Sequence, residues 1–75
     1  MATPLQFTIE ETVGVLSTSK SGWTRELNLV SWNDRPAKFD LRDWSQDHSK
    51  MGKGLTLTND EIEQLRQLLD GMVSD

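Results

Sequence analysis

The chain has 75 residues, a formal net charge of −4, three tryptophans and neither tyrosine nor cysteine. A chain of this length forms one domain, and so small a core leaves little net stability. The lack of cysteine excludes disulfides and thiolate metal sites, and the single histidine, His48, cannot form a metal cluster alone. Oligomerisation remains as a source of stability, and a homodimer is its commonest form.

The sequence does not predict a signal peptide or a membrane span. The first five residues lack the basic and apolar segments of a signal peptide, and no apolar run approaches the ~20 residues that span a bilayer. We expect a cytoplasmic protein without membrane contact, nucleoid-associated if it is bacterial. Residues 1–5 are expected to be a flexible N-terminus, 6–72 one domain and 73–75 a tail.

Alternating apolar residues predict the first strand. Between Gln6 and Leu16 the odd positions carry the apolar side chains, which is typical of a strand with one apolar face. Residues 10–12 are a candidate break in this strand. The small polar residues 17–22 then predict a turn.

The next two strands form a predicted hairpin. They span residues 23–32 and 37–44, around a turn at Asn33-Asp34-Arg35-Pro36. Their expected core face carries Leu27, Leu29, Phe39 and Leu41. Parity places the remaining strand residues on the opposite face, namely Glu26, Asn28, Val30, Trp32, Lys38, Asp40, Arg42 and Trp44.

The C-terminal part predicts a loop at 45–54, a short strand at 55–57 and one helix. Thr58 with Glu61 fits a capping box, and Gly71 is a candidate helix end. An apolar stripe at helical spacing predicts core or dimer contact; it consists of Ile62, Leu65, Leu68, Leu69 and Met72. The predicted fold is α+β: a four-stranded antiparallel curved sheet, then one helix, in a homodimer.

Basic residues and tryptophans share one window of the chain. Seven of the eight Lys and Arg residues lie between Lys20 and Lys53 with five acids, which gives this window a net charge of +2. Unpaired bases stack on flat rings and phosphates pair with cations, so the mixture indicates single-stranded nucleic acid. The candidate nucleic-acid-binding residues are Trp32, Trp44, Trp23, Arg25, Lys38, Arg42, Lys53, Lys50, Lys20 and Asn28.

Each candidate has a structural alternative. One helix can cover only one face of the sheet, which favours Trp32 and Trp44 as open to bases, whereas the parity of Trp23 favours core or dimer contact. The cations could instead pair across strands with Glu26, Asp40 or Asp43, and those in loops are commonly solvated. Asp40 and Asp43 flank Arg42 and could neutralise it in part or hold it in place. Exposed tryptophans could also anchor another protein.

Nothing in the chain assembles an enzyme site or a cofactor site. Gly52-Lys53-Gly54 lacks the spacing and the following Ser or Thr of a phosphate loop. Asp40 and Asp43 point to opposite faces of a strand and cannot act as an acid–base pair. No nucleophile is marked beside His48.

Several segments resemble a known family. Residues 39–44 (Phe-Asp-Leu-Arg-Asp-Trp) and 51–58 (Met-Gly-Lys-Gly-Leu-Thr-Leu-Thr) resemble the C-terminal domain of the transcriptional positive cofactor 4 family. Residues 21–24, 27–33 and 51–54 are similar to segments of its small bacterial YdbC-type proteins. The resemblance covers roughly residues 7–69.

This resemblance implies a four-stranded antiparallel sheet and one helix, with two copies dimerised largely through the helices. The implied dimer residues are Ile62, Leu65, Leu69 and Met72. It also implies single-stranded DNA over the strands with little sequence preference, single-stranded RNA being an alternative. By position Trp32 matches a family aromatic residue, and Arg42 and Lys53 match family basic residues. Trp44 falls on an aromatic position, one residue before the family tryptophan.

Overall fold

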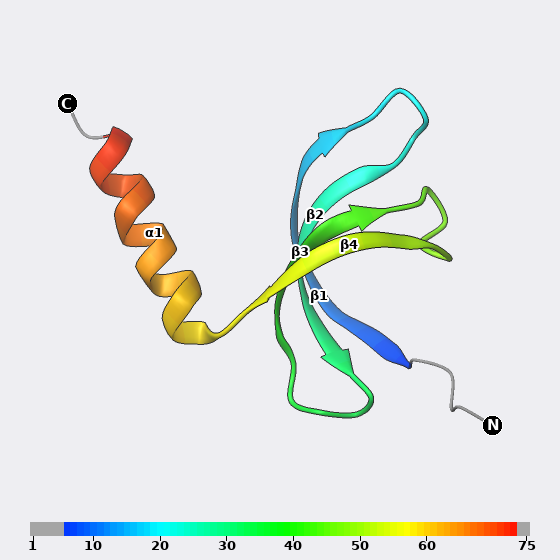
Figure 1. The fold of residues 1–75 in the computed structure, drawn as a ribbon, viewed down its shortest axis with the longest axis horizontal. Helices are drawn as coiled ribbons and strands as arrows, with labels where there is room; N and C mark the ends of the chain where they lie inside the picture. The colour runs from blue at the N-terminus through cyan, green and yellow to red at the C-terminus, as the bar shows by residue number, and fades with distance from the viewer. Residues whose placement is uncertain (1–5, 74–75) are drawn as a thin grey trace.

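The computed structural model describes residues 6–73 as one antiparallel sheet followed by a helix (Figure 1). The elements are β1 (Phe7–Thr18), β2 (Thr24–Trp32), β3 (Lys38–Trp44), β4 (Met51–Leu57) and α1 (Asn59–Val73). The sheet order β1-β2-β3-β4 confirms the predicted arrangement of strands and helix. The expectations for residues 1–5 and 74–75 lie outside the described residues, whereas residue 73, expected in the tail, belongs to α1.

The β2–β3 hairpin has the predicted parity. Asn28 pairs with Asp40 and Val30 pairs with Lys38, and paired residues of an antiparallel ladder point to the same face. Asn33 and Asp34 adopt positive φ values of 50° and 61°, which these residue types tolerate in turns. We call one side the tryptophan face, which carries Glu26, Asn28, Val30, Trp32, Lys38, Asp40, Arg42 and Trp44. The leucine face carries Leu27, Leu29, Phe39, Leu41, Leu55 and Leu57.

Strand β1 is continuous but irregular. Its register with β2 shifts at three places, the first between Ile9 and Glu11, within the region expected to break. Each bulge reverses the facing of later residues, so the odd-parity face does not persist. Val13 and Val15 are consequently about half exposed, and the prediction of one apolar face along this strand is wrong.

Strand β4 begins four residues earlier than the sequence predicted. Met51 pairs with Trp44, and Gly54 pairs with Arg42. Two glycines in four residues are typical of a loop because glycine lacks a side chain to pack in a strand. The pairing with β3 overrides this tendency, so residues 51–54 belong to the sheet.

The helix start follows the predicted capping box. The Thr58 backbone N–H donates to Glu61 Oε1 at 2.9 Å, and the Glu61 N–H donates to Thr58 Oγ1 at 3.1 Å. The end does not follow the prediction, because α1 continues through Gly71 to Val73. No helix within residues 6–73 is long and apolar enough to cross a membrane.

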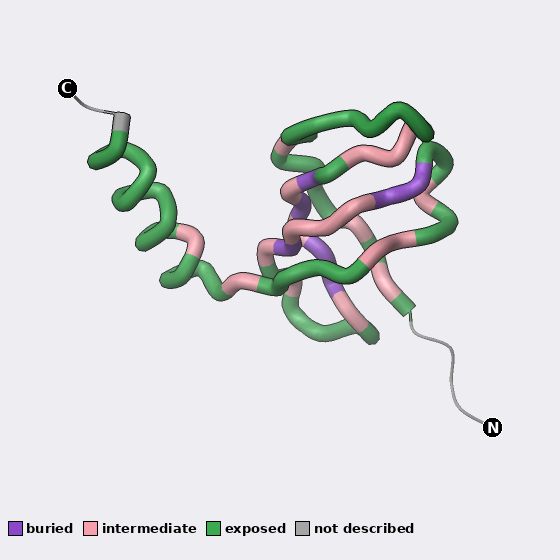
Figure 2. Tube along the Cα trace, turned by 45° about the horizontal axis from the view of Figure 1, so that its top comes forward, coloured by how far each residue is buried: buried purple, intermediate pink, exposed green. Residues whose placement is uncertain are grey.

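The helix does not cover the sheet. Figure 1 shows α1 projecting away from the strands, and Figure 2 shows it almost entirely exposed. The radius of gyration is 14.1 Å, compared with about 11 Å expected for a compact chain of this length. Leu68, Leu69 and Met72 are at least half exposed, so the apolar stripe is not part of a core within one chain.

The buried centre lies on the tryptophan face, which corrects the predicted core. Val30 and Trp44 are the fully buried apolar residues among those described, whereas the leucine face is half-buried to exposed. The sheet itself covers its tryptophan face by curling. The rings of Phe7 on β1 and Trp44 on β3 are 5.2 Å apart, although a flat sheet would separate these strands by about 10 Å.

Candidate nucleic-acid interface

Trp44 lies at the bottom of the curled sheet. It has no exposed surface, because Phe7 covers its ring at 5.2 Å and the His48 imidazole lies 5.5 Å away. Parity placed Trp44 correctly on the face of Trp32, but the curl of β1 and the loop after β3 bury it. The prediction that its ring is open to a base is therefore wrong, and Trp44 acts as a core residue.

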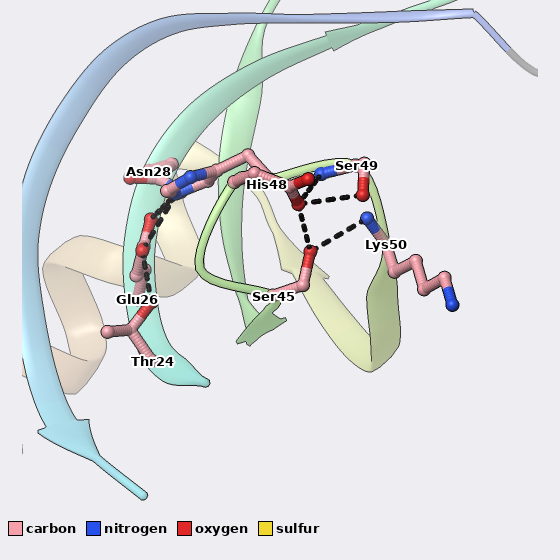
Figure 3. Close-up of polar contacts among 8 residues, drawn as sticks. Thr24, Glu26, Asn28, Ser45, His48, Ser49 and Lys50 are labelled. Carbon is pink, nitrogen blue, oxygen red and sulfur yellow. Dashed lines mark hydrogen bonds and ion pairs between the residues drawn. The ribbon is translucent and has the colours of Figure 1, made fainter. Parts of the chain in front are cut away.

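The loop that covers Trp44 is attached to a buried carboxylate. His48 Nε2 lies 2.9 Å from Glu26 Oε2, while Thr24 and Asn28 donate to the same carboxylate (Figure 3). Burial raises the pKa of Glu26, but the hydrogen bonds from Thr24, Asn28 and His48 outweigh it and leave the pKa below its usual value. An ionised Glu26 thus holds loop 45–50 across the sheet.

The same loop is stiffened from within. Asp47 Oδ1 accepts hydrogen bonds from the Ser49 hydroxyl and backbone N–H and from the Ser45 hydroxyl. These donors, led by Ser49, lower the pKa of Asp47 to about 2. The Lys50 side chain points away from this network, toward solvent (Figure 3).

Trp32 is half-buried and forms one platform with Arg42. The Arg42 guanidinium lies 4.7 Å from the ring centroid of Trp32, and the ring of Phe7 lies 5.8 Å from it. Two hydrogen bonds to the fully buried Asp40, at 2.5 and 2.7 Å, fix the orientation of the guanidinium. A third donor reaches Met51 Sδ at 3.4 Å, so two of the five guanidinium N–H donors are unused within the described chain.

Gly54 provides the space in which Arg42 lies. A Cβ built at this position would come within 2.7 Å of Arg42 Nε and 2.8 Å of the Leu41 carbonyl oxygen. Any side chain would therefore push Arg42 off Trp32. Gly52 differs, because its Cβ would meet Asp43 Cβ at an ordinary 3.6 Å.

The predicted cations divide between the two faces. Lys38 is exposed on the tryptophan face, while Arg25 and Lys53 line a shallow groove on the other side with Leu41 and Leu55. Arg42 also lines this groove, so it lies where the two faces meet at the β4 edge. The structure therefore does not bring all four predicted phosphate contacts to one face.

Arg25 forms a cross-strand ion pair, which was the alternative to phosphate contact in the sequence analysis. Its Nε donates to Asp43 Oδ1 at 2.8 Å, and this bond raises the pKa of Arg25 and lowers that of Asp43. Lys20 and Lys50 lie exposed in the two loops at the opposite end of β2 from Trp32. Trp23 is half-buried beside these loops rather than in the core.

Asn28 is a support residue and not a contact residue. It is fully buried and donates to Glu26 Oε1 at 3.1 Å. Its Oδ1 and the Nε1 atoms of Trp32 and Trp44 are buried without a hydrogen-bond partner in the described chain.

Sequence reasoning found one of the two residues that shape the platform. Asp40 was expected to neutralise or hold Arg42 and does hold it, whereas Gly54 was expected only as part of a loop. The alternation of Asp40 and Arg42 on one strand was a usable signal, because residues two apart share a face. The cover formed by Phe7 and His48 had no such signal, since both depend on the curl of the sheet.

Comparison with known proteins agrees with this geometry. The profile of the family described as Transcriptional Coactivator p15 (PC4) matches residues 19–68, from the turn before β2 to the middle of α1. The chain belongs to this family. A protein of Treponema pallidum (strain Nichols), described as an uncharacterized protein, is 60% identical over 62 residues. The match covers 83% of this chain and 73% of that protein.

Membership confirms the resemblance seen in the sequence. The family binds single-stranded DNA, includes a transcriptional coactivator and is not enzymatic. The matched residues include Trp32, Arg42, Lys53 and Gly54, but not β1. Phe7 and the bulged β1 strand therefore lie in a part of this chain that the profile does not describe.

Proposed function

We propose that this protein binds single-stranded DNA with little sequence preference, as a homodimer, in transcription regulation, replication or repair. Family membership is the observation that carries the proposal. The Trp32–Arg42 platform supports it physically, because a flat aromatic ring beside a guanidinium suits base stacking and cation–π contact.

Phosphates would be held around this platform. Lys38 lies on the same face, and the two unused N–H donors of Arg42 are at the β4 edge next to Lys53. The buried acids Glu26 and Asp40 are already paired with His48 and Arg42, so their charge does not oppose a phosphate directly. A single strand would lie along the platform, with its phosphates near these cations.

The dimer would cover the remaining apolar surface. The leucine face is half-buried to exposed, and in the α1 stripe Leu65, Leu69 and Met72 are exposed while Ile62 is half-buried. Contiguous apolar surface on a small chain is typical of an interface. Packing these surfaces between two copies leaves the Trp32–Arg42 platform of each copy free for nucleic acid.

A titration tests the proposal. Tryptophan fluorescence is followed while dT, rU and duplex oligonucleotides of one length are added, with molar mass measured in parallel. We expect quenching by dT and a linear fall of log K with log salt, about 0.7 per phosphate contact. Stronger binding of rU than dT would redirect the proposal to RNA, and no binding at low salt would overturn it.

Single substitutions test which residues contribute to oligonucleotide binding. Trp32→Ala should weaken dT binding about tenfold, because one stacked base contributes ~1–3 kcal/mol. Lys38→Gln should reduce the salt slope by about one contact. Arg66→Gln is the control, since Arg66 lies on exposed α1 and pairs with Glu63. Loss of a protein partner in Trp32→Ala with dT binding intact would favour an interaction module instead.

A further inference from the structure

Two open grooves meet at Trp23, at the end of the sheet opposite the Trp32–Arg42 platform. One groove has a volume of about 480 Å³ and the other about 360 Å³, within the range of ligand-binding clefts. Ser21 and Trp23 line both grooves and therefore form the ridge between them. Neither groove is part of the platform at Trp32.

The ridge is held in place by its own turn. The Ser19 backbone N–H donates to the Trp23 carbonyl at 2.7 Å, and the Gly22 N–H donates to the Ser19 carbonyl at 3.0 Å. Gly22 has a φ of 90°, which favours glycine, and its Cβ position faces the Gln46 side chain at 3.5 Å. The turn before β2 thus lies against the loop after β3, which fixes Trp23 between them.

The ring of Trp23 lacks the aromatic cover of the other two tryptophans. Trp32 and Trp44 both pack against Phe7, whereas no other aromatic ring within residues 6–73 packs on Trp23. Trp23 is also half-buried rather than buried. Trp23 lines both open grooves at this end of β2.

The walls of the grooves suit one nucleotide each. The lining residues include short hydroxyl side chains and the Gln46 amide. These groups can donate hydrogen bonds to base edges and accept hydrogen bonds from them. The hydroxyl residues are Ser17, Thr18, Ser19, Ser21, Ser45 and Ser49. Lys50 lines the larger groove as a phosphate partner, while the smaller groove is lined by the ion pair of Arg25 and Asp43. Asp47 is occupied by Ser45 and Ser49.

We propose that Trp23 is a second stacking site, where the strand bound at the Trp32–Arg42 platform leaves the sheet between the two loops. This inference rests on the proposed single-stranded-DNA binding. Trp23 and Trp32 bracket β2, whose contour between them is about 30 Å at about 3.3 Å per residue. The curl of the sheet, which brings Arg42 from the Trp23 end of β2 onto the ring of Trp32, shortens the direct path. At a stacked spacing of about 3.4 Å per nucleotide, roughly nine nucleotides are therefore an upper limit for reaching both sites.

Oligonucleotide length is the test. The dissociation constants of the wild type and of Trp23→Leu are measured for dT oligomers from 4 to 16 nucleotides at low salt. The ratio of the two constants should be near one for the shortest oligomers and should rise to about tenfold once an oligomer reaches both rings. Trp32→Leu is the comparison, and its ratio should be raised at every length.

Two further measurements separate contact from folding. Trp23→Phe keeps an aromatic ring and should restore most of the long-oligomer affinity. In Trp32→Phe, the remaining fluorescence comes from Trp23 and the buried Trp44, so quenching should appear with long oligomers and be weak with short ones.

The outcomes are distinct. A Trp23→Leu ratio near one at all lengths, or raised equally at all lengths with a lowered melting temperature, overturns the second site while single-stranded binding stands. Failure of the wild type to bind any oligomer overturns the proposed function, and the second site with it.

Discussion

The two faces of the sheet differ in composition and in burial, and the two differences run in opposite directions. The tryptophan face is rich in polar and charged residues yet contains the buried centre, whereas the leucine face is apolar and remains half-buried to exposed. On the first face each described buried acid has a cation or histidine partner: Asp40 pairs with Arg42, and Glu26 with His48. The single chain therefore pairs its buried acids by itself and leaves its apolar face half-buried to exposed.

The comparison also separates a fully buried tryptophan from a half-buried one. Trp44 and Trp32 share a face, but one is fully buried and the other forms a half-buried platform with Arg42. The curl of β1 makes this difference, because Phe7 reaches across β2 to cover Trp44. The face of the sheet on which a tryptophan lies therefore does not decide whether its ring is exposed.

The largest effect on stability and molar mass is expected from a charge placed in the apolar α1 stripe. Leu69→Arg places a charge in the α1 stripe and should reduce the molar mass in solution from twice 8.5 kDa to 8.5 kDa, with loss of most of the stability. Gln67→Arg is the matched control, because residue 67 lies on the opposite side of the helix. Light scattering and thermal melting measure both. Equal effects of the two variants would contradict the assignment of the stripe.

A smaller effect on the free energy of unfolding is expected from breaking the ion pair of Asp40 and Arg42. Asp40→Asn leaves the largely buried Arg42 without its carboxylate, and breaking such a pair costs about 3 kcal/mol of the free energy of unfolding. Asp43→Asn, on the other face of the same strand, breaks only the exposed pair with Arg25 and should change this free energy little. Urea unfolding compares the two. Similar losses for both variants would remove the distinction between the faces.

The smallest effect is expected on the pH dependence of stability, through Asp47. Asp47 has a folded-state pKa of about 2, against 3.8 as its usual value, so the folded chain binds fewer protons here. Its contribution to stability is full above about pH 4 and is lost as the pH falls toward 2. The melting temperature of Asp47→Ala should lie below that of the wild type at pH 5, and the difference should shrink to near zero at pH 2. A difference independent of pH would argue against the Asp47 network.

The order of elements follows from local sequence. Alternation in the hairpin, the Asn33-Asp34 turn and the Thr58–Glu61 capping box each act over a few residues, and each is present in the structure. The match of residues 19–68 to the family likewise rests on sequence alone. These features were predictable because their interactions join neighbours in the chain.

The core and the exposure of the tryptophans depended on tertiary structure. Three bulges in β1 let it curl over the tryptophan face, so Phe7 buries Trp44 from a position distant in the chain. His48 covers the same ring from the nearby loop, which its contact with the distant Glu26 holds in place. Pairing with β3 also turned Gly52 to Gly54 from an expected loop into strand, with Gly54 seating Arg42. Strand parity determined which side chains share a face, but only the curvature of the sheet decided which of them are covered.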